Sequence, residues 1–68
     1  MENILPNIKK HRKQQGLSHW RIARLLGISK SAYTMTESGQ TSLSVERLFK
    51  IAQILNVPVT EIIKENRL

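Results

Sequence analysis

Apolar residues recur at helical spacing in short stretches of this chain, and glycine or proline separates one stretch from the next. The clearest period lies in residues 44–55, where one helix face would carry Val45, Leu48, Ile51, Ala52 and Leu55. A shorter stripe of the same spacing lies in residues 19–26, with Ile22, Ala23 and Leu26. No alternating strand pattern competes with these helices. The pattern therefore predicts an all-α protein.

Two of the predicted helices lie close together and are joined by a turn that contains one glycine. Ser18 precedes the helix over residues 19–26, and its hydroxyl can accept a hydrogen bond from a free N–H group of the first turn. Gly27 can adopt the left-handed conformation that ends a helix. Ser29 can cap the next helix, over residues 30–37. Two helices joined by such a turn are typical of the motif that places its second helix in the major groove of DNA.

A first and a fifth helix complete the predicted fold. The first runs from about Pro6 to Gln15, because proline suits the first position of a helix, where its missing N–H costs nothing. Asn56 can end the fourth helix in the left-handed region, and Pro58 blocks its continuation. Thr60 can then cap a short fifth helix.

These residues, taken in order, resemble the helix-turn-helix domain of the phage repressor and Cro family. The residues that carry the resemblance are Ile8, Arg12, Gly16, Leu17, Ser18, Ile22, Ala23, Leu26, Gly27, Ile28, Ser29, Glu37, Gly39, Leu48, Ala52, Leu55 and Val57. The similar region extends from Leu5 to about Lys64. The resemblance implies a compact, lambda repressor-like bundle of five helices, as a single domain over residues 1–68 with its core in residues 5–64.

Charge and composition restrict the classes of partner. Eleven Lys and Arg against five Asp and Glu give a net charge of +6, which favours a polyanion such as nucleic acid. The basic residues are scattered, and no apolar run approaches the roughly 20 residues of a membrane helix, so no membrane partner is expected. The absence of cysteine and of a long apolar segment after the N-terminus MENILPNIKK leads us to expect a cytoplasmic protein.

The resemblance implies that the helix over residues 30–37 reads bases. The residues placed for base contact are Lys30, Ser31, Thr34 and Met35. Lys30 can donate to guanine O6 and N7, Ser31 can pair with several bases, and Met35 can contact a thymine methyl group. The alternative is an ordinary solvated helix face. Thr36 stands where an apolar residue is common, and a small rotation of this helix would change which residues face the bases.

Phosphate contacts are implied on both sides of that helix. Ser18 and His19 begin a helix, whose free N–H groups and partial positive charge favour phosphate. For His19 the alternative is an ordinary exposed position. The loop after the base-reading helix supplies the second set: Ser38, Gln40, Thr41 and Ser42. That loop carries no Lys or Arg, so contacts there would depend on hydroxyls, an amide and backbone N–H groups.

Other polar residues are interpreted as structural or solvated. In the family the pair that matches Arg12 and Glu37 forms a partly buried salt bridge between the first and third helices. The basic run over residues 9–13 is interpreted as a solvated face that adds long-range attraction to DNA. His11 and His19 are the only histidines, and with no cysteine and few carboxylates no metal site is expected.

The predicted function is sequence-specific binding of double-stranded DNA by a small bacterial or phage transcriptional regulator. The chain shows no catalytic triad or glycine-rich phosphate loop, so neither an enzyme nor a cofactor is expected. A homodimer would bind two half-sites, and the candidate dimer surface consists of Ile54, Val59, Ile63 and Leu68.

The alternative is a protein-interaction module, antitoxin-like or an adaptor, that uses the same fold. Trp20 and Leu25 support it, because together they would form a surface for a protein partner. Trp20 can instead pack over the side chain of Arg24 in a cation–π contact, which would explain its exposure without any partner.

Overall fold

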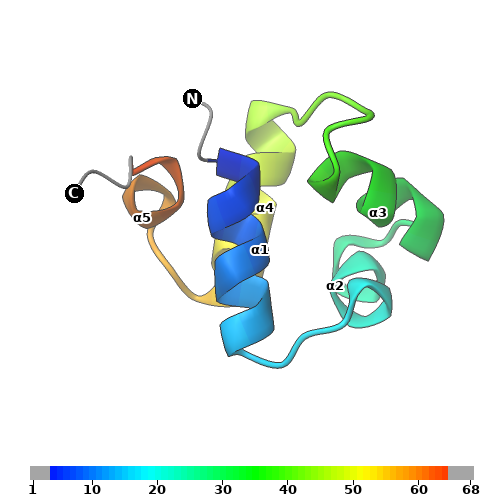
Figure 1. Cartoon of the computed structure of the whole chain (residues 1–68), viewed down its shortest axis with the longest axis horizontal. Coiled ribbons are helices and arrows are strands. Elements are labelled where there is room, and N and C mark those ends of the chain that lie inside the picture. Colours follow the sequence, from blue (N-terminus) through cyan, green and yellow to red (C-terminus); the bar gives the residue numbers. More distant parts are fainter. Residues whose placement is uncertain (1–3, 65–68) are drawn as a thin grey trace.

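The computed structural model describes residues 4–64, and this part of the chain forms five α-helices (Figure 1). The helices are α1 (Ile4–Gln14), α2 (His19–Leu26), α3 (Lys30–Glu37), α4 (Val45–Leu55) and α5 (Val59–Ile63). α1 and α4 pack together in the middle of the molecule, α5 lies on one side of them, and α2 and α3 lie on the other. The predicted all-α, five-helix fold is confirmed.

Serine side chains begin α2 and α3 as the sequence predicts. Ser18 Oγ accepts a hydrogen bond from the backbone N–H of Arg21 at 3.1 Å, and Ser29 Oγ accepts one from Ala32 at 3.0 Å. Ser44 caps α4 in the same way. Each bond satisfies an N–H group that has no intrahelical partner, so the start of each helix is set by its own sequence.

α2 and α4 both end at a residue in the left-handed region. Gly27 has φ of 75° after α2, and Asn56 has φ of 56° after α4. The chain then folds back over the helix end: the N–H of Ile28 donates to the carbonyl of Ala23 at 3.0 Å, and Val57 makes the equivalent bond after α4. This tight turn after α2 sets the angle at which α3 leaves it.

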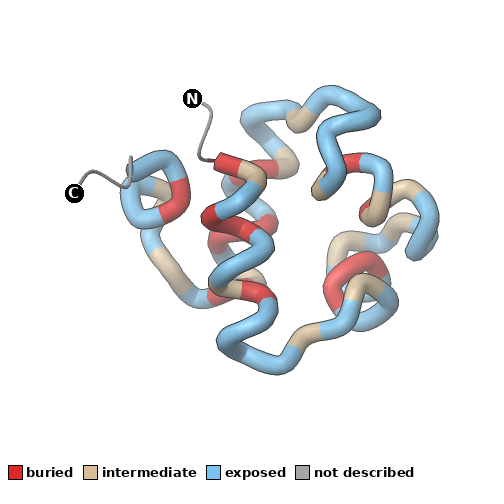
Figure 2. The backbone as a smooth tube through the Cα atoms, viewed as in Figure 1, coloured by how far each residue is buried: buried red, intermediate tan, exposed pale blue. Residues whose placement is uncertain are grey.

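The buried segments of the helices face one another in the interior (Figure 2). The buried apolar side chains are Ile4, Ile8, Ile22, Ala23, Tyr33, Leu48, Ile51, Ala52, Leu55 and Ile62. All five helices contribute to this one cluster, so no helix of the described part stands apart from the core.

Two predictions about helix positions are wrong. α1 begins at Ile4 and not at Pro6, which gives the thin apolar face of this helix one more buried residue. Pro6 lies within the first turn, where an N–H group has no intrahelical acceptor to lose. Val45, predicted to lie on the buried stripe of α4, is 69% exposed, because it occupies the first turn and the stripe is covered only from Leu48 onward.

The start of α5 also differs from the prediction. α5 begins at Val59, with Pro58 in the cap position and no side-chain cap bond, so Thr60 lies inside the first turn and caps nothing. The backbone of Pro58, with φ of −67° and ψ of 149°, already has the extended conformation of a cap residue. Ile62 is fully buried, whereas Ile63 is 40% exposed.

Two amide side chains attach α1 and its end to the C-terminal helices, a feature that the sequence analysis missed. Asn7 Nδ2 donates to the carbonyls of Ile62 at 2.7 Å and Lys64 at 2.8 Å. Gln15 Nε2 donates to the carbonyl of Leu55 at 2.6 Å. These carbonyls lie at the ends of α5 and α4, where the last carbonyl groups of a helix have no backbone N–H donor within that helix. The side-chain amides supply the missing donors.

Candidate nucleic-acid interface

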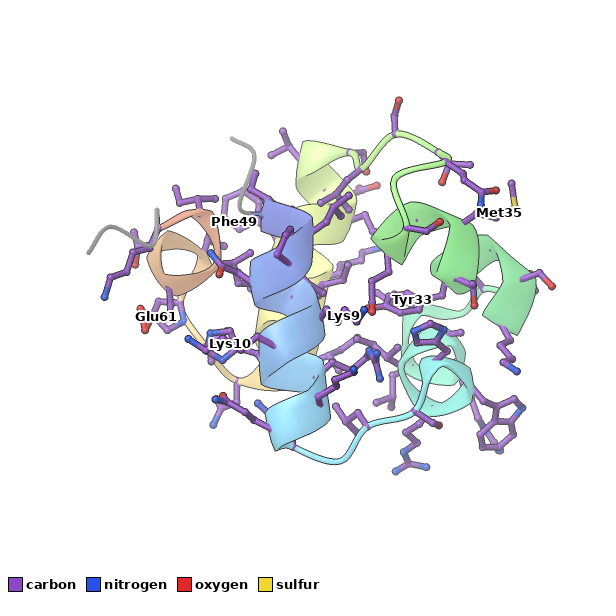
Figure 3. All side chains as sticks on the ribbon, viewed as in Figure 1. Lys9, Lys10, Tyr33, Met35, Phe49 and Glu61 are labelled. Carbon is purple, nitrogen blue, oxygen red and sulfur yellow. The ribbon has the colours of Figure 1, made fainter. Side chains whose placement is uncertain are left out.

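α3 lies at the edge of the molecule and packs against α2 and α1 through one face only (Figure 1). That inner face carries Tyr33, which is fully buried, and Thr36, which is 4% exposed. The opposite face points to solvent, where Met35 projects from the helix (Figure 3). The fold therefore presents one side of α3 outward.

The four residues predicted to contact bases lie together on this outer face. They line one shallow depression of the surface: Lys30, Ser31, Thr34 and Met35. Thr34 is partly buried and the other three are exposed. The structure thus brings the predicted set together, and their contact with bases remains a prediction.

Thr36 fits the interior without any rotation of α3. Its hydroxyl donates to the carbonyl of Ala32 at 3.0 Å and lies 3.2 Å from the hydroxyl of Thr41. A buried hydroxyl costs little when it is hydrogen-bonded in this way. The alternative register, with α3 turned to expose Thr36, is therefore not the one observed.

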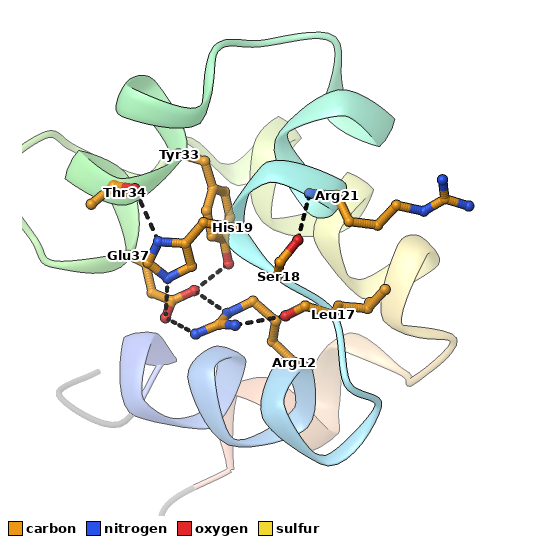
Figure 4. Close-up of polar contacts among 8 residues, drawn as sticks. All are labelled: Arg12, Leu17, Ser18, His19, Arg21, Tyr33, Thr34 and Glu37. Carbon is orange, nitrogen blue, oxygen red and sulfur yellow. Dashed lines mark hydrogen bonds and ion pairs between the residues drawn. The ribbon is translucent and has the colours of Figure 1, made fainter.

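Arg12 of α1 and Glu37 at the end of α3 form a bidentate ion pair (Figure 4). Nε of Arg12 donates to Oε2 of Glu37 at 2.9 Å and Nη2 donates to Oε1 at 3.0 Å. The two side chains are only 9% and 5% exposed. Nη1 of Arg12 donates to the carbonyl of Leu17 at 2.6 Å, so the same guanidinium also holds the segment before α2. The pair joins the first and third helices as the resemblance implied.

The hydroxyl of Tyr33 donates a third hydrogen bond to the Glu37 carboxylate. Burial raises the pKa of Tyr33, and the bond to Glu37 raises it further. Burial alone would raise the pKa of Glu37, but the hydrogen bonds from Arg12 and Tyr33 outweigh it and hold that pKa below its usual range. Glu37 is therefore a buried carboxylate that remains charged.

His19 has contacts that neither sequence-based interpretation anticipated. Its side chain is 29% exposed, with Nδ1 at 2.9 Å from Thr34 Oγ1 and Nε2 at 3.3 Å from Glu37 Oε1 (Figure 4). The ring also meets the ring of Tyr33 edge-on, with centroids 5.4 Å apart. The imidazole therefore connects the buried ion pair to a residue on the outer face of α3, and both of its nitrogens face protein atoms.

The other residues predicted to contact phosphate are exposed. Ser18 lies at the N-terminus of α2, and the loop after α3 carries Ser38, Gln40, Thr41 and Ser42. The backbone N–H groups of residues 38–41 already donate to carbonyls of Thr34, Met35 and Thr36. Along residues 38–41 the loop therefore offers side chains rather than backbone N–H groups.

Trp20 is 55% exposed, and the guanidinium of Arg24 lies 5.4 Å from the centroid of its ring. This is the predicted cation–π contact, and it is confirmed. Leu25 is 50% exposed on the same helix, so α2 presents two large apolar side chains to solvent.

The candidate dimer residues are only partly accessible. Ile54 and Val59 are half-buried, Ile63 is exposed, and Leu68 lies outside the described residues. Phe49, which was not among the predicted surface residues, is 54% exposed and lines a hollow on α4 together with Pro58 and Val59. The sequence did contain a signal for its exposure: Phe49 follows Leu48 in the chain but does not have the helical spacing of the buried α4 residues, so it lies on another face of the helix.

A helix-turn-helix family model matches residues 8–62, so the chain belongs to this family. The resemblance to the repressor and Cro type is thereby confirmed. No helix within residues 4–64 is long and apolar enough to cross a membrane.

Three curated bacterial proteins are similar to the chain. Antitoxin PezA of Streptococcus pneumoniae is 36% identical over 91% of the chain and 39% of its own length. The uncharacterized HTH-type transcriptional regulator YqaE of Bacillus subtilis is 38% identical, over 85% of the chain and 50% of its own length. The HTH-type transcriptional regulator SutR of Escherichia coli is 37% identical, over 93% of the chain and 38% of its own length. The chain thus spans half or less of each relative, and no solved structure gives a significant match.

The buried ion pair predicts a measurable coupling between Arg12 and Glu37. Arg12→Met and Glu37→Gln should each lower the free energy of unfolding by about 3–5 kcal/mol, because each leaves the remaining buried charge without its opposite charge. The double mutant should lose less than the sum of the two. A double-mutant cycle by urea denaturation measures this, and a coupling below about 0.5 kcal/mol would show that the residues act independently.

The lowered pKa of Glu37 predicts stability that is lost in acid. In the folded state its pKa lies below the value of about 4.3 for an unfolded glutamate, so its contribution is present above that pH and is lost as pH falls through the folded pKa. Wild-type protein and Glu37→Gln should therefore differ most in unfolding free energy near pH 7, and the difference should shrink as pH falls below about 4.3. A difference that stays constant over this range would contradict the assignment.

Proposed function

We propose that this chain binds double-stranded DNA sequence-specifically, as the DNA-binding part of a bacterial or phage transcriptional regulator. The observation that carries the proposal is the outer face of α3, where four side chains suited to base edges lie together: Lys30, Ser31, Thr34 and Met35. Family membership supports the same function, and two of the relatives are named transcriptional regulators.

In this proposal α3 enters the major groove and its outer residues contact base edges. Lys30 donates to guanine O6 and N7, the hydroxyl of Ser31 pairs with several bases, and Met35 contacts a thymine methyl group. Thr34 acts differently, because the ring of His19 lies 2.9 Å from its hydroxyl and so orients it. The base preference at Thr34 is then set by two residues and not by one.

Backbone phosphates flank α3 on both sides in this proposal. Ser18 and His19 begin α2, where first-turn N–H groups and the helix dipole favour an anion. At His19 the contact is made by the backbone, since both ring nitrogens face protein atoms. The phosphates of the other DNA strand are contacted by side chains of the loop after α3: Ser38, Gln40, Thr41 and Ser42. The net charge of +6 adds attraction to any duplex.

We further propose that two copies bind together to half-sites about 34 Å apart. The cluster of buried apolar side chains in residues 4–64 is small, and association is one usual source of added stability for a small core. The described residues proposed for association are Ile54, Val59 and Ile63 at the C-terminal side, and Leu68, predicted with them, lies outside the described residues. This role needs no cofactor, metal or catalytic group, and it places the chain in the cytoplasm with the DNA.

The second candidate function is that of a protein-interaction module. Two observations favour it: Trp20 and Leu25 are exposed on α2, and one relative is named an antitoxin. The two functions differ in which surface they use. Binding of selected DNA that is unaffected by Trp20→Ala and Leu25→Ala would favour the regulator, whereas a chain that selects no sequence from random duplexes would favour the protein partner.

Lys30→Ala is expected to reduce discrimination between DNA sequences. After the preferred site has been selected from random duplexes, the variant should bind it about 1–3 kcal/mol more weakly and should bind a scrambled duplex almost as wild type does, because the lost contact carries sequence information. Titration of labelled duplexes measures both affinities.

Lys64→Ala is the matched control, because it removes the same charge at the end of α5, on the opposite side of α1 from α3. It should leave the ratio of specific to scrambled affinity unchanged. An unchanged ratio in Lys30→Ala as well would mean that α3 does not read bases through this lysine.

The proposed dimer is expected to form at micromolar concentration and to depend on Ile63. Ile63→Glu should shift the equilibrium toward monomer, because it places a charge in the proposed apolar contact. Val45→Glu is the control, since it adds the same charge at another exposed apolar position. Sedimentation over a concentration series measures both, and a wild-type chain that stays monomeric even with DNA would contradict the homodimer.

A further inference from the structure

The loop after α3 has few groups that could bind a phosphate. Residues 38–42 include no Lys or Arg, and the N–H groups of residues 38–41 are already bonded to carbonyls of α3. The C-terminal end of α3 also carries a partial negative charge, which disfavours an anion there. A cation from another element would therefore strengthen a phosphate contact on this side of α3.

Lys9 of α1 lies beside this end of α3. It lines one cleft with His19, Thr34 and Ser38, and an adjoining cleft that Ser38 also borders. Figure 3 places Lys9 on the side of α1 that faces α3, and Lys10 on the side that faces α5. Of the two neighbouring lysines, only Lys9 therefore borders the residues proposed to contact DNA.

The charge of Lys9 is not neutralised by the carboxylate in the same cleft. Glu37 borders both clefts, but it pairs with Arg12 and His19, and Lys9 forms no ion pair with any acidic residue in positions 4–64. Because Arg12 already compensates Glu37, the exposed ammonium of Lys9 retains its charge for an external anion.

We propose that Lys9 is a phosphate anchor: its ammonium group, together with the hydroxyl of Ser38, binds a backbone phosphate of the DNA strand that passes the C-terminal end of α3. This inference rests on the proposed DNA-binding function and adds a contact to it. A lysine ammonium on a flexible stem is a suitable point charge for phosphate. The anchor supplies the cation that the loop lacks, and it carries no sequence information.

The test compares Lys9→Ala with Lys10→Ala, which removes the same charge from the next position of the same helix. Affinity for the selected and the scrambled duplex is titrated at four salt concentrations. Lys9→Ala should weaken both duplexes by a similar factor, about 3- to 10-fold at low salt, and should reduce the slope of log affinity against log salt by about 1. Lys10→Ala should stay within about 2-fold of wild type, because a charge remote from the phosphate acts only through screened attraction.

Two further variants separate the contact from a structural effect. Lys9→Arg should restore the affinity and the salt slope, whereas Lys9→Gln, which keeps most of the stem, should behave as Lys9→Ala does. Equal effects of Lys9→Ala and Lys10→Ala would overturn the anchor while leaving the DNA-binding function in place. A wild-type chain that binds no duplex would overturn both.

Discussion

The arrangement of α1, α2 and α3 depends on one buried carboxylate. Glu37 accepts hydrogen bonds from Arg12 of α1 and from Tyr33 of its own helix, and the ring of His19 of α2 faces it. A charged carboxylate that is 5% exposed is tolerated only when it is paired and hydrogen-bonded, so these contacts must form together. Since the partners come from all three helices, one side chain sets the orientation in which α3 presents its outer face.

The structure divides α3 between two tasks that do not compete. Tyr33 and Thr36 face inward and meet their polar requirements through Glu37, Ala32 and a neighbouring threonine. The outer face has no such requirements and is free to carry polar side chains. The helix is therefore positioned by its buried side, and in the proposed function it is the exposed side that meets DNA.

Local signals explain why much of this fold could be predicted from the sequence. Ser18, Gly27 and Ser29 set the bounds of α2 and α3 through backbone geometry that each residue favours by itself. Val45 and Thr60 were predicted less well from such signals. Apolar spacing placed Val45 on the buried stripe of α4, but spacing does not show how far along α4 the other helices cover that stripe. Thr60 is a residue type that caps helices, but Pro58, two positions earlier, already has the backbone conformation of a cap residue.

The contacts of the candidate interface were less predictable because they join distant positions. His19 meets Thr34 and Glu37 only after two turns and the packing of three helices have been set, and no local pattern encodes that meeting. The engagement of the loop N–H groups by α3 carbonyls is likewise a product of the turn that residues 38–41 adopt. Family resemblance supplied Arg12 and Glu37 as a pair, which periodicity alone would have left as surface charge.

Because His19 forms a hydrogen bond with Thr34, the outward-facing residues of α3 differ in how easily each can be substituted during evolution. Lys30, Ser31 and Met35 make no side-chain hydrogen bond within residues 4–64, so each can be exchanged alone. Replacement of Thr34 would deprive an imidazole nitrogen of its partner beside a buried carboxylate. In the proposed function, base contacts can therefore change one at a time at these three positions, whereas a change at Thr34 also removes the partner of His19.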